Sequence, residues 1–398
     1  MVWYTCTPIA FSGGGDFFSR DSGLVCKGLQ SLGINCKSIM PLPVLHGDIG
    51  EDLIRIEYPK LEDSKWWRSI DATNVILYTW GASKYRRVAE AVRNSGARVF
   101  INLDSSGIVS PVTSALFYRT VLGIAIRSYG AILGIPLGML RNLIFRFYVP
   151  FFVEPGRVVH LKSATAIGCI SPSALTMWRC WARTYAPELV ERMYLVPHPT
   201  TDDLMYDASI EKRDMVIAIG RWNDTEQKRP NFLAQTIEKA ANLRGKTEFH
   251  IFGNPGPVLP VWYARLAMPI RNRIFIHGKV PHPVIANALL QSRVSLCSSS
   301  HESTHIVSEE ALCAGASVVA PCRAELSSML WFTSHGSGRL AVEDTPNGLA
   351  ETLLLELDAW DRGERNPEEI SSFWHSFVSA SAVANKIRCL LEERESKT

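Results

Sequence analysis

Two glutamates, Glu302 and Glu310, stand eight positions apart in the stretch from His301 to Pro321, which reads HESTHIVSEEALCAGASVVAP. The pattern predicts a polar loop, a short helix capped by Ser303 or Thr304, and then a buried strand. Both carboxylates would then lie near a helix N-terminus, whose free N–H groups attract anions. Carboxylates accept hydrogen bonds from sugar or ribose hydroxyls, so a sugar nucleotide suits the pair. A surface helix with two solvated glutamates is the alternative interpretation.

Cations in a second loop supply the complementary chemistry. Arg221 and Lys228 follow the apolar run VIAIG, and Arg229 stands next to Lys228 as a rival for the same role. Positive charge is needed where a diphosphate leaves with developing negative charge. The alternative interpretation is a loop of solvated basic residues.

A glycine-rich loop, Ser12 to Asp16, follows the first apolar run of the chain. Gly14 and Gly15 would let the backbone approach a phosphate closely, although three glycines can also form a simple turn. The loop is neither a P-loop nor G-x-G-x-x-G. An NAD-dependent oxidoreductase built on paired Rossmann domains would need that second motif, so this alternative is weaker.

The elements that must position these residues alternate between strand and helix. Each βαβ unit implies parallel strands, so the sequence predicts an α/β protein with two Rossmann-like doubly wound domains. The expected strands lie at 2–11, 34–40, 74–79, 97–103, 164–170 and 194–196, then from 215, and at 248–252, 273–276, 294–297 and 316–320. Expected helices include 22–32, 84–94, 351–357 and 373–395.

The expected domains are 1–200, a linker at 201–213 and a second domain at 214–372, with the helix 373–395 crossing back to the first domain. Ligands of open α/β sheets bind at the carboxyl ends of the strands. Asp104 follows the strand 97–103 at that edge and is therefore a candidate on the acceptor side. A helix-capping aspartate is the alternative.

Composition indicates an ordinary globular protein of 398 residues with 46% hydrophobic and 20% charged residues. The net charge of +3 is too small to suggest nucleic acid as a partner. Nine cysteines without a C-x-x-C pair favour a reducing compartment over a disulfide or zinc framework. The chain opens directly into an apolar run without a basic leader, so we expect no signal peptide and a cytoplasmic location.

Between residues 105 and 153 there is no acidic residue, and four arginines stand among apolar side chains. The uncharged helix-like window 128–140 is shorter than the roughly 20 residues of a spanning helix. We therefore expect no crossing of a bilayer. A basic, apolar face on an anionic membrane surface and a buried helical hairpin are both open.

The stretch around Glu302 and Glu310 resembles the E-x7-E signature of retaining glycosyltransferases of the GT-B fold, family 4 type. ALCAGASVVAP is similar to the tail of that motif, and Thr304, His305 and Ile306 stand where the family has a Phe-Gly pair next to the donor. The resemblance implies that Glu302 holds the donor sugar and Glu310 the ribose diol.

The same resemblance implies that Arg221 and Lys228 clamp the diphosphate and that Gly14 and Gly15 face the donor phosphates. The loop with Val280 would meet the nucleobase through its backbone. Glu302 and Asp104 are the catalytic candidates. The two domains of this fold face a central cleft, and the last helix returns to the first domain.

The implied reaction moves a hexosyl unit from a UDP- or GDP-linked sugar to an acceptor hydroxyl with retention, in polysaccharide or glycolipid assembly. The acceptor would be a glycan or be lipid-linked. No D-x-D triplet occurs, so neither a metal nor another cofactor is expected. A binding module that retains the donor site without catalysis is the other alternative.

Overall fold

The computed structural model describes residues 2–10, 18, 21–45, 48, 52–103 and 115–393, with side chains from residue 121 in the last range. Gly14, Gly15 and Asp104 therefore lie outside the described residues. The chain divides into two units: Met1–Pro199 with Val383–Thr398, and Thr200–Ala382.

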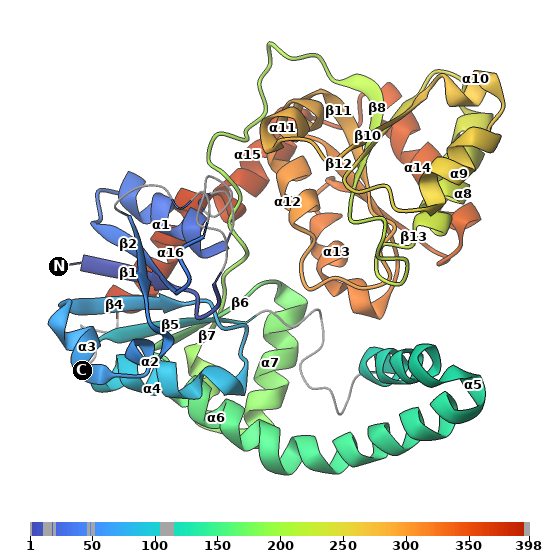
Figure 1. Cartoon of the computed structure of the whole chain (residues 1–398). Helices are drawn as coiled ribbons and strands as arrows, with labels where there is room; N and C mark the ends of the chain where they lie inside the picture. Colours follow the sequence, from blue (N-terminus) through green and yellow to red (C-terminus); the bar gives the residue numbers. More distant parts are fainter. Residues whose placement is uncertain are drawn as a thin grey trace. The chain divides into compact units, whose positions relative to one another are not determined.

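Unit 1 is built on a parallel sheet of seven strands in the order β3-β2-β1-β4-β5-β6-β7 (Figure 1). The strands are β1 (Val2–Cys6), β2 (Cys36–Pro41), β3 (Leu53–Ile56), β4 (Ala72–Leu77), β5 (Arg98–Leu103), β6 (Ala166–Cys169) and β7 (Met193–Leu195). The helices are α1 (Asp21–Ser31), α2 (Tyr58–Leu61), α3 (Ser64–Ser69), α4 (Arg86–Asn94), α5 (Ala115–Tyr148), α6 (Glu154–Lys162) and α7 (Pro172–Tyr185). Short turns are η1 (Ser83–Tyr85), the π-helical η2 (Val149–Val153) and η3 (Pro187–Arg192).

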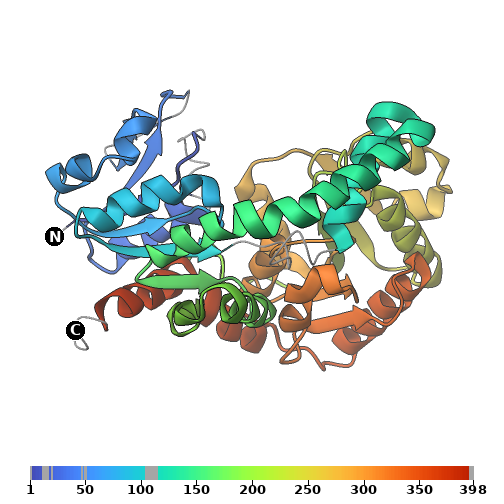
Figure 2. The same ribbon diagram turned by 90° about the horizontal axis from the view of Figure 1, so that it is seen from below.

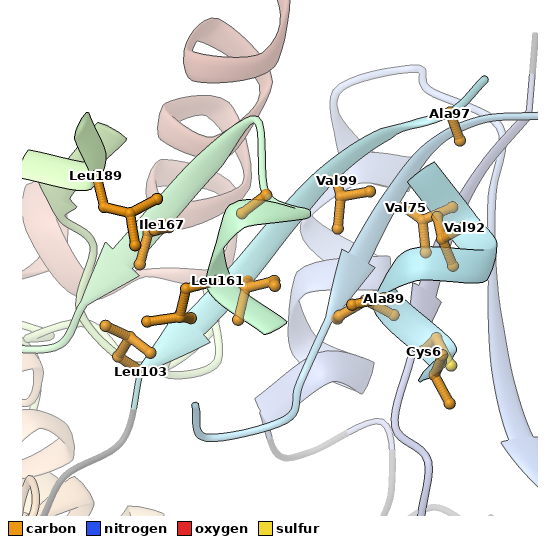
Figure 3. Packing of buried hydrophobic residues seen from close by; sticks show 14 of the residues in the cluster. Cys6, Val75, Ala89, Val92, Ala97, Val99, Leu103, Leu161, Ile167 and Leu189 are labelled. Atoms are coloured by element: carbon orange, nitrogen blue, oxygen red, sulfur yellow. The ribbon is translucent and has the colours of Figure 1, made fainter. Parts of the chain in front are cut away.

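Both faces of this sheet are buried, because successive side chains of a strand point to opposite sides. In β4, Val75 and Leu77 join one apolar cluster and Ile76 joins the other. The first cluster (Figure 3) includes Trp67 of α3, whose indole N–H donates to the Leu61 carbonyl at 2.9 Å. Continuous apolar strands such as NVIL follow from this double burial.

Unit 2 has a parallel sheet of six strands in the order β10-β9-β8-β11-β12-β13. The strands are β8 (Arg213–Ile219), β9 (Glu248–Phe252), β10 (Ile274–Gly278), β11 (Ser292–Leu296), β12 (Ser317–Pro321) and β13 (Gly338–Ala341). The helices are α8 (Pro230–Leu243), α9 (Val258–Arg265), α10 (Met268–Arg271), α11 (His282–Gln291), α12 (Ile306–Cys313), α13 (Ser327–Phe332), α14 (Pro346–Asp361) and α15 (Pro367–Val378), with η4 at Ala324–Leu326. The predicted fold class, two Rossmann-like parallel sheets, is confirmed for these two units.

One predicted helix is in fact two. Residues 373–395 were expected to be continuous, but α15 ends at Val378 and α16 (Ala380–Glu392) follows after Ser379, whose backbone is extended. The Ser379 hydroxyl accepts from the Ala382 N–H at 3.3 Å, which starts the new helix. Leu391 and other apolar residues of α16 pack in the core of unit 1, so the last helix does return to the first unit.

Helix α5 is a hairpin, because Gly130 has a non-helical backbone with φ 72° and ψ 169°. Figures 1 and 2 show that it runs on into α6 as one long helical stretch. The arms cross at Gly134, where an added Cβ would lie 2.5 Å from the Ala125 carbonyl oxygen. The alternative of a buried hairpin is wrong, since Ile132 is 91% exposed.

By length and composition alone, the helical stretch Val121–Lys162 is long and apolar enough to cross a membrane, with a hydropathy of 1.5 and 22% of that window buried. The expectation of no crossing counted only uncharged runs such as 128–140, and it stays a prediction. Arginines interrupt that count, but their long side chains can reach a membrane surface from inside an apolar helix.

Candidate functional site

The predicted donor residues gather at the carboxyl edge of the unit 2 sheet. Strands β8 and β11 are neighbours there, although β9 and β10 intervene in sequence, so this is the switch point of the strand order. The loop after β8 carries Arg221 and Lys228, and the loop after β11 carries Glu302. Open α/β sheets bind ligands at such a point.

Glu302 is the centre of this group and is only 7% exposed. One carboxylate oxygen, Oε1, accepts from the Lys228 ammonium and from the Ser299 hydroxyl, the latter at 2.6 Å. The other oxygen, Oε2, accepts from the Gln227 amide at 3.1 Å. The carboxylate therefore has three donors, from two loops that are 74 residues apart.

Electrostatics keep Glu302 ionised. Burial alone would raise its pKa, but His305, the Lys228 charge and the hydrogen bonds outweigh burial, and the pKa lies below its usual value. Burial and the Lys228 charge lower the pKa of His305 to about 4. At neutral pH His305 is thus uncharged, and Lys228 is the cation that balances Glu302.

The other two basic residues of the first loop differ sharply from each other. The Arg229 guanidinium is occupied: it donates to the Ser298 carbonyl at 2.6 Å and pairs with Asp344 at 2.8 Å. Its backbone is left-handed, with φ 50°, and its guanidinium lies over the ring of Phe232 of α8, 3.9 Å from the ring centroid. The Arg221 side chain is 72% exposed and donates to Gln227 at 3.1 Å. Lys228 and Arg229 are thus each paired with a buried or half-buried carboxylate, and Arg221 is the most exposed of the three cations and the most open to an anion.

The N-terminus of α12 differs from the sequence prediction. Its N-cap is His305, without a side-chain cap, and neither Ser303 nor Thr304 occupies that position. Thr304 instead donates to the Glu309 carboxylate at 3.0 Å, and the His305 ring contacts the Ser308 hydroxyl at 2.7 Å. The Ser308 N–H donates to the His305 carbonyl at 2.7 Å, so the N–H groups at this helix start that could meet an anion are those of Ile306 and Val307.

Glu310 lies in the second turn of α12 and contacts the His282 ring at 2.9 Å. The hydrogen bond to Glu310 raises the pKa of His282 despite partial burial. Val280 is half-buried in the loop between β10 and α11, two residues before His282. The predicted ribose carboxylate and the predicted base loop are therefore adjacent in space.

The carboxyl edge of the unit 1 sheet carries a separate polar group, in which Asn102 lies near the end of β5. The Asn102 side-chain amide oxygen, Oδ1, accepts from the Thr79 N–H at 3.1 Å, and the Thr79 hydroxyl contacts the His160 ring at 2.8 Å. Burial and the Arg157 charge lower the pKa of His160 to about 4, so this imidazole is neutral. All three side chains, of Asn102, Thr79 and His160, are buried.

Three residues of the unit 2 group were not singled out from the sequence: Gln227, Ser299 and His282. Gln227 precedes Lys228, Ser299 stands three positions before Glu302, and both contact Glu302. The side chain of His282 could have been found from the pattern HGKVPH after a strand, since polar residues at a strand's carboxyl end are candidates. Among the described residues, no group of three His, Cys, Asp or Glu side chains could hold a metal ion.

Comparisons with known proteins address the fold and the class of protein. Residues 213–358 match the family model described as glycosyl transferases group 1. No curated protein matches the sequence. The chain is similar in structure to the lipopolysaccharide outer core galactosyltransferase WaaB in its apo form, with a TM-score of 0.62, 15% identity and coverage of 99% of this chain and 100% of the other.

Two further solved structures are similar over nearly their whole length. The pneumococcal O-GlcNAc transferase GtfA in complex with UDP and GlcNAc gives a TM-score of 0.65 at 10% identity, covering 99% of each chain. Anabaena Alr3699/HepE in complex with UDP gives 0.62 at 11% identity, covering 100% of each chain. Identities this low show the fold, which is GT-B.

The fold and the matched domain together support a glycosyltransferase of the GT-B class. The matched range includes Arg221, Lys228, Glu302 and Glu310, so the candidate site lies inside the group 1 domain.

Proposed function

We propose that this protein transfers a hexosyl unit from a nucleotide diphosphate sugar to an acceptor hydroxyl. The observation that carries the proposal is the buried contact of Glu302 with Lys228 at the switch point of the unit 2 sheet, next to the exposed Arg221. A carboxylate beside two cations fits a donor that presents hydroxyls beside a diphosphate.

In this proposal Glu302 accepts from a hydroxyl of the donor sugar and Glu310 from the ribose diol. Arg221, Lys228 and the N–H groups at the start of α12 take the diphosphate. These donors stabilise the charge that develops on the leaving group, so the chemistry needs no metal or other cofactor. Thr304, His305 and Ile306 line the donor sugar, and the Val280 loop meets the base.

The family 4 type implied by the E-x7-E motif leads us to propose retention of the anomeric configuration, with the leaving phosphate as the base. UDP in the complexes of GtfA and HepE favours a UDP-linked donor, with GDP as the alternative. Gly14, Gly15 and Asp104 keep their predicted roles as proposals.

The proposed acceptor is a glycan or a lipid-linked sugar, because WaaB, a structural neighbour, acts in a lipopolysaccharide core. A lipid-linked acceptor is met at a membrane surface from the cytoplasm. Contact with an anionic membrane through residues 105–153 is therefore part of the proposal. The same setting would place the enzyme in polysaccharide or glycolipid assembly.

Calorimetry with UDP tests the ribose role. We expect Glu310→Ala to weaken UDP binding at least tenfold, since a charge-assisted hydrogen bond contributes about 1.5–3 kcal/mol. The matched control is Glu351→Ala, which removes an exposed glutamate from α14. Unchanged affinity of the Glu310 variant would contradict the proposed role.

Donor hydrolysis separates an enzyme from a binding module that has lost catalysis. We expect slow release of UDP or GDP from the matching nucleotide sugar without acceptor, and a much lower rate for Glu302→Gln. A protein that binds the nucleotide sugar tightly and never releases nucleoside diphosphate, with or without acceptors, would be a binding module instead.

A further inference from the structure

The helical arm after the turn at Gly130, residues 131–153, exposes an unusual amount of apolar surface. We call these residues the apolar arm. The exposed fraction of Ile132 is 91%, that of Phe147 62% and that of Phe151 70%. A helix that is apolar over most of its circumference is normally buried in protein or lipid. Exposed patches of this kind mark a surface that meets a partner.

The side of the arm that packs within the hairpin is defined by small residues. An added Cβ at Gly138 would lie 3.1 Å from Leu122 Cα, and Gly134 makes the closer contact with Ala125 described above. Val149 continues this stripe and is 3% exposed. Glycines four residues apart let two helices approach closely, as they do in membrane proteins.

The opposite side of the arm is entirely apolar. At about 100° per residue, the positions that face away from Gly134, Gly138 and Val149 form one stripe along the arm. These positions are Ile132, Leu133, Pro136, Met139, Leu140, Leu143, Ile144, Phe147 and Phe151. No polar or charged side chain interrupts them.

The arginines of the arm flank the packed stripe. By the same helical arithmetic, Arg141 and Arg146 lie about 60–80° to either side of it. Both therefore point away from the apolar stripe, toward the level of lipid phosphates if that stripe faces acyl chains. Residues 115–153 contain no acidic residue that could pair with these arginines. Their positive charge is complementary to anionic lipid.

Two orientations in a bilayer differ in where Arg141 lies. The arm is about 35 Å long at about 1.5 Å per residue, and Arg141 is close to its middle, about 16 Å from the turn. An arm that crossed a hydrocarbon core of about 30 Å would hold this arginine near the centre, where charge is least tolerated. An arm that lies in the plane keeps both arginines at the phosphates.

We propose that the apolar arm lies in the plane of one leaflet of an anionic membrane, with the stripe from Ile132 to Phe151 among the acyl chains. Arg141 and Arg146 bind lipid phosphates beside it. This inference deepens the membrane contact proposed above and rests on it, but it is independent of the chemistry of sugar transfer.

Co-sedimentation of the full chain with phosphatidylcholine vesicles, with and without phosphatidylglycerol, tests the proposal. We expect binding that requires phosphatidylglycerol and falls with salt. Leu143→Gln with Phe147→Gln should weaken it at least tenfold, and Arg141→Leu should weaken it about fivefold, the share of one arginine at an anionic surface. The matched controls are Val342→Gln, which is 95% exposed in unit 2, and Arg87→Leu, with a side chain 70% exposed; both should bind as the unchanged protein does.

The variant Arg141→Leu also separates the orientations. Tighter binding of this variant would mean that the arm crosses the bilayer and would overturn the in-plane proposal. No binding at low salt would overturn the membrane contact, and a concentration-dependent dimer without lipid binding would assign the stripe to a second copy of the chain. UDP binding and nucleotide-sugar hydrolysis, measured on the same variants, report separately on the proposed function.

Discussion

Replacing Lys228 by methionine tests how strongly the buried ion pair holds the candidate site together. The Lys228 and Glu302 side chains are 11% and 9% exposed, so the substitution leaves a buried carboxylate without its cation. Breaking such a pair costs about 3–5 kcal/mol. Since Ser299 and Gln227 still donate to Glu302, we expect the lower end, about 3 kcal/mol.

A loss of this size should be visible in thermal unfolding. For a domain of this size, about 1 kcal/mol lowers Tm by about 2–4 °C, so the transition of unit 2 should fall by about 6–12 °C. Scanning calorimetry of the full chain at neutral pH measures it. Arg221→Met is the matched control, because its side chain is 72% exposed, and it should change stability by less than about 0.5 kcal/mol.

The double variant makes the test specific to the pair. Lys228→Met combined with Glu302→Gln should cost clearly less than the sum of the two single changes, because neither leaves an uncompensated charge once both are gone. Additive effects, or a loss below about 1 kcal/mol for Lys228→Met, would refute the reasoning that the pair is buried and charged.

Three further predictions concern other parts of unit 2 and the thiols. Gly315→Ala should destabilise the protein by at least about 2 kcal/mol in urea unfolding, because φ is +77° and the new Cβ would lie 2.6 Å from the Pro367 carbonyl oxygen. His282→Gln should lower the free energy of unfolding by about 0.5 kcal/mol near pH 6, after allowance for solvent screening, and by almost nothing near pH 9. The hydrogen bond to Glu310 raises the pKa of His282, so the pair stabilises the fold fully below the ordinary pKa of histidine, and this stabilisation is lost as pH rises through the raised pKa. A larger cost at high pH would reverse that sign. Native protein titrated with a thiol reagent should show two fast-reacting cysteines, Cys180 and Cys322, which are exposed. The half-buried Cys389 should react more slowly, and the six buried cysteines most slowly.

Much of the fold follows from sequence because buried strands of a parallel sheet are continuous apolar runs. Strand β9 has the predicted bounds, Glu248–Phe252, and the other predicted strands are present with shifted ends. Strands β3 and β13 were not predicted, since LIRI and GRLA are short and half-buried at the two sheet edges. Helices cover an edge strand less completely on both faces, so its sequence shows a weaker run of apolar residues.

The sequence pointed to residues that the structure brings together, but it did not predict the contacts between them. The resemblance selected Glu302 and Lys228, but their ion pair joins positions 74 apart and depends on two adjacent strands, β8 and β11. The pair of Arg229 with Asp344 joins positions 115 apart, and the sequence around Arg229 does not indicate it. The exposure of the apolar arm could not be predicted from the sequence either, because the same apolar residues could equally have been packed in the core of a unit.

Hydrogen bonds around Thr200 join the two ends of unit 2. Thr200 donates from its N–H to the Val378 carbonyl at 2.7 Å and forms a parallel bridge with Ser379, while Asp202 accepts from the Ser381 N–H at 2.9 Å. The first and the last residues of unit 2 are thus neighbours in space. Residues 200–382 therefore form a module that is inserted into unit 1 with its two ends side by side. Excision of that module and closure of the gap by a short linker would leave each half its own sheet, as insertion sites with neighbouring ends allow.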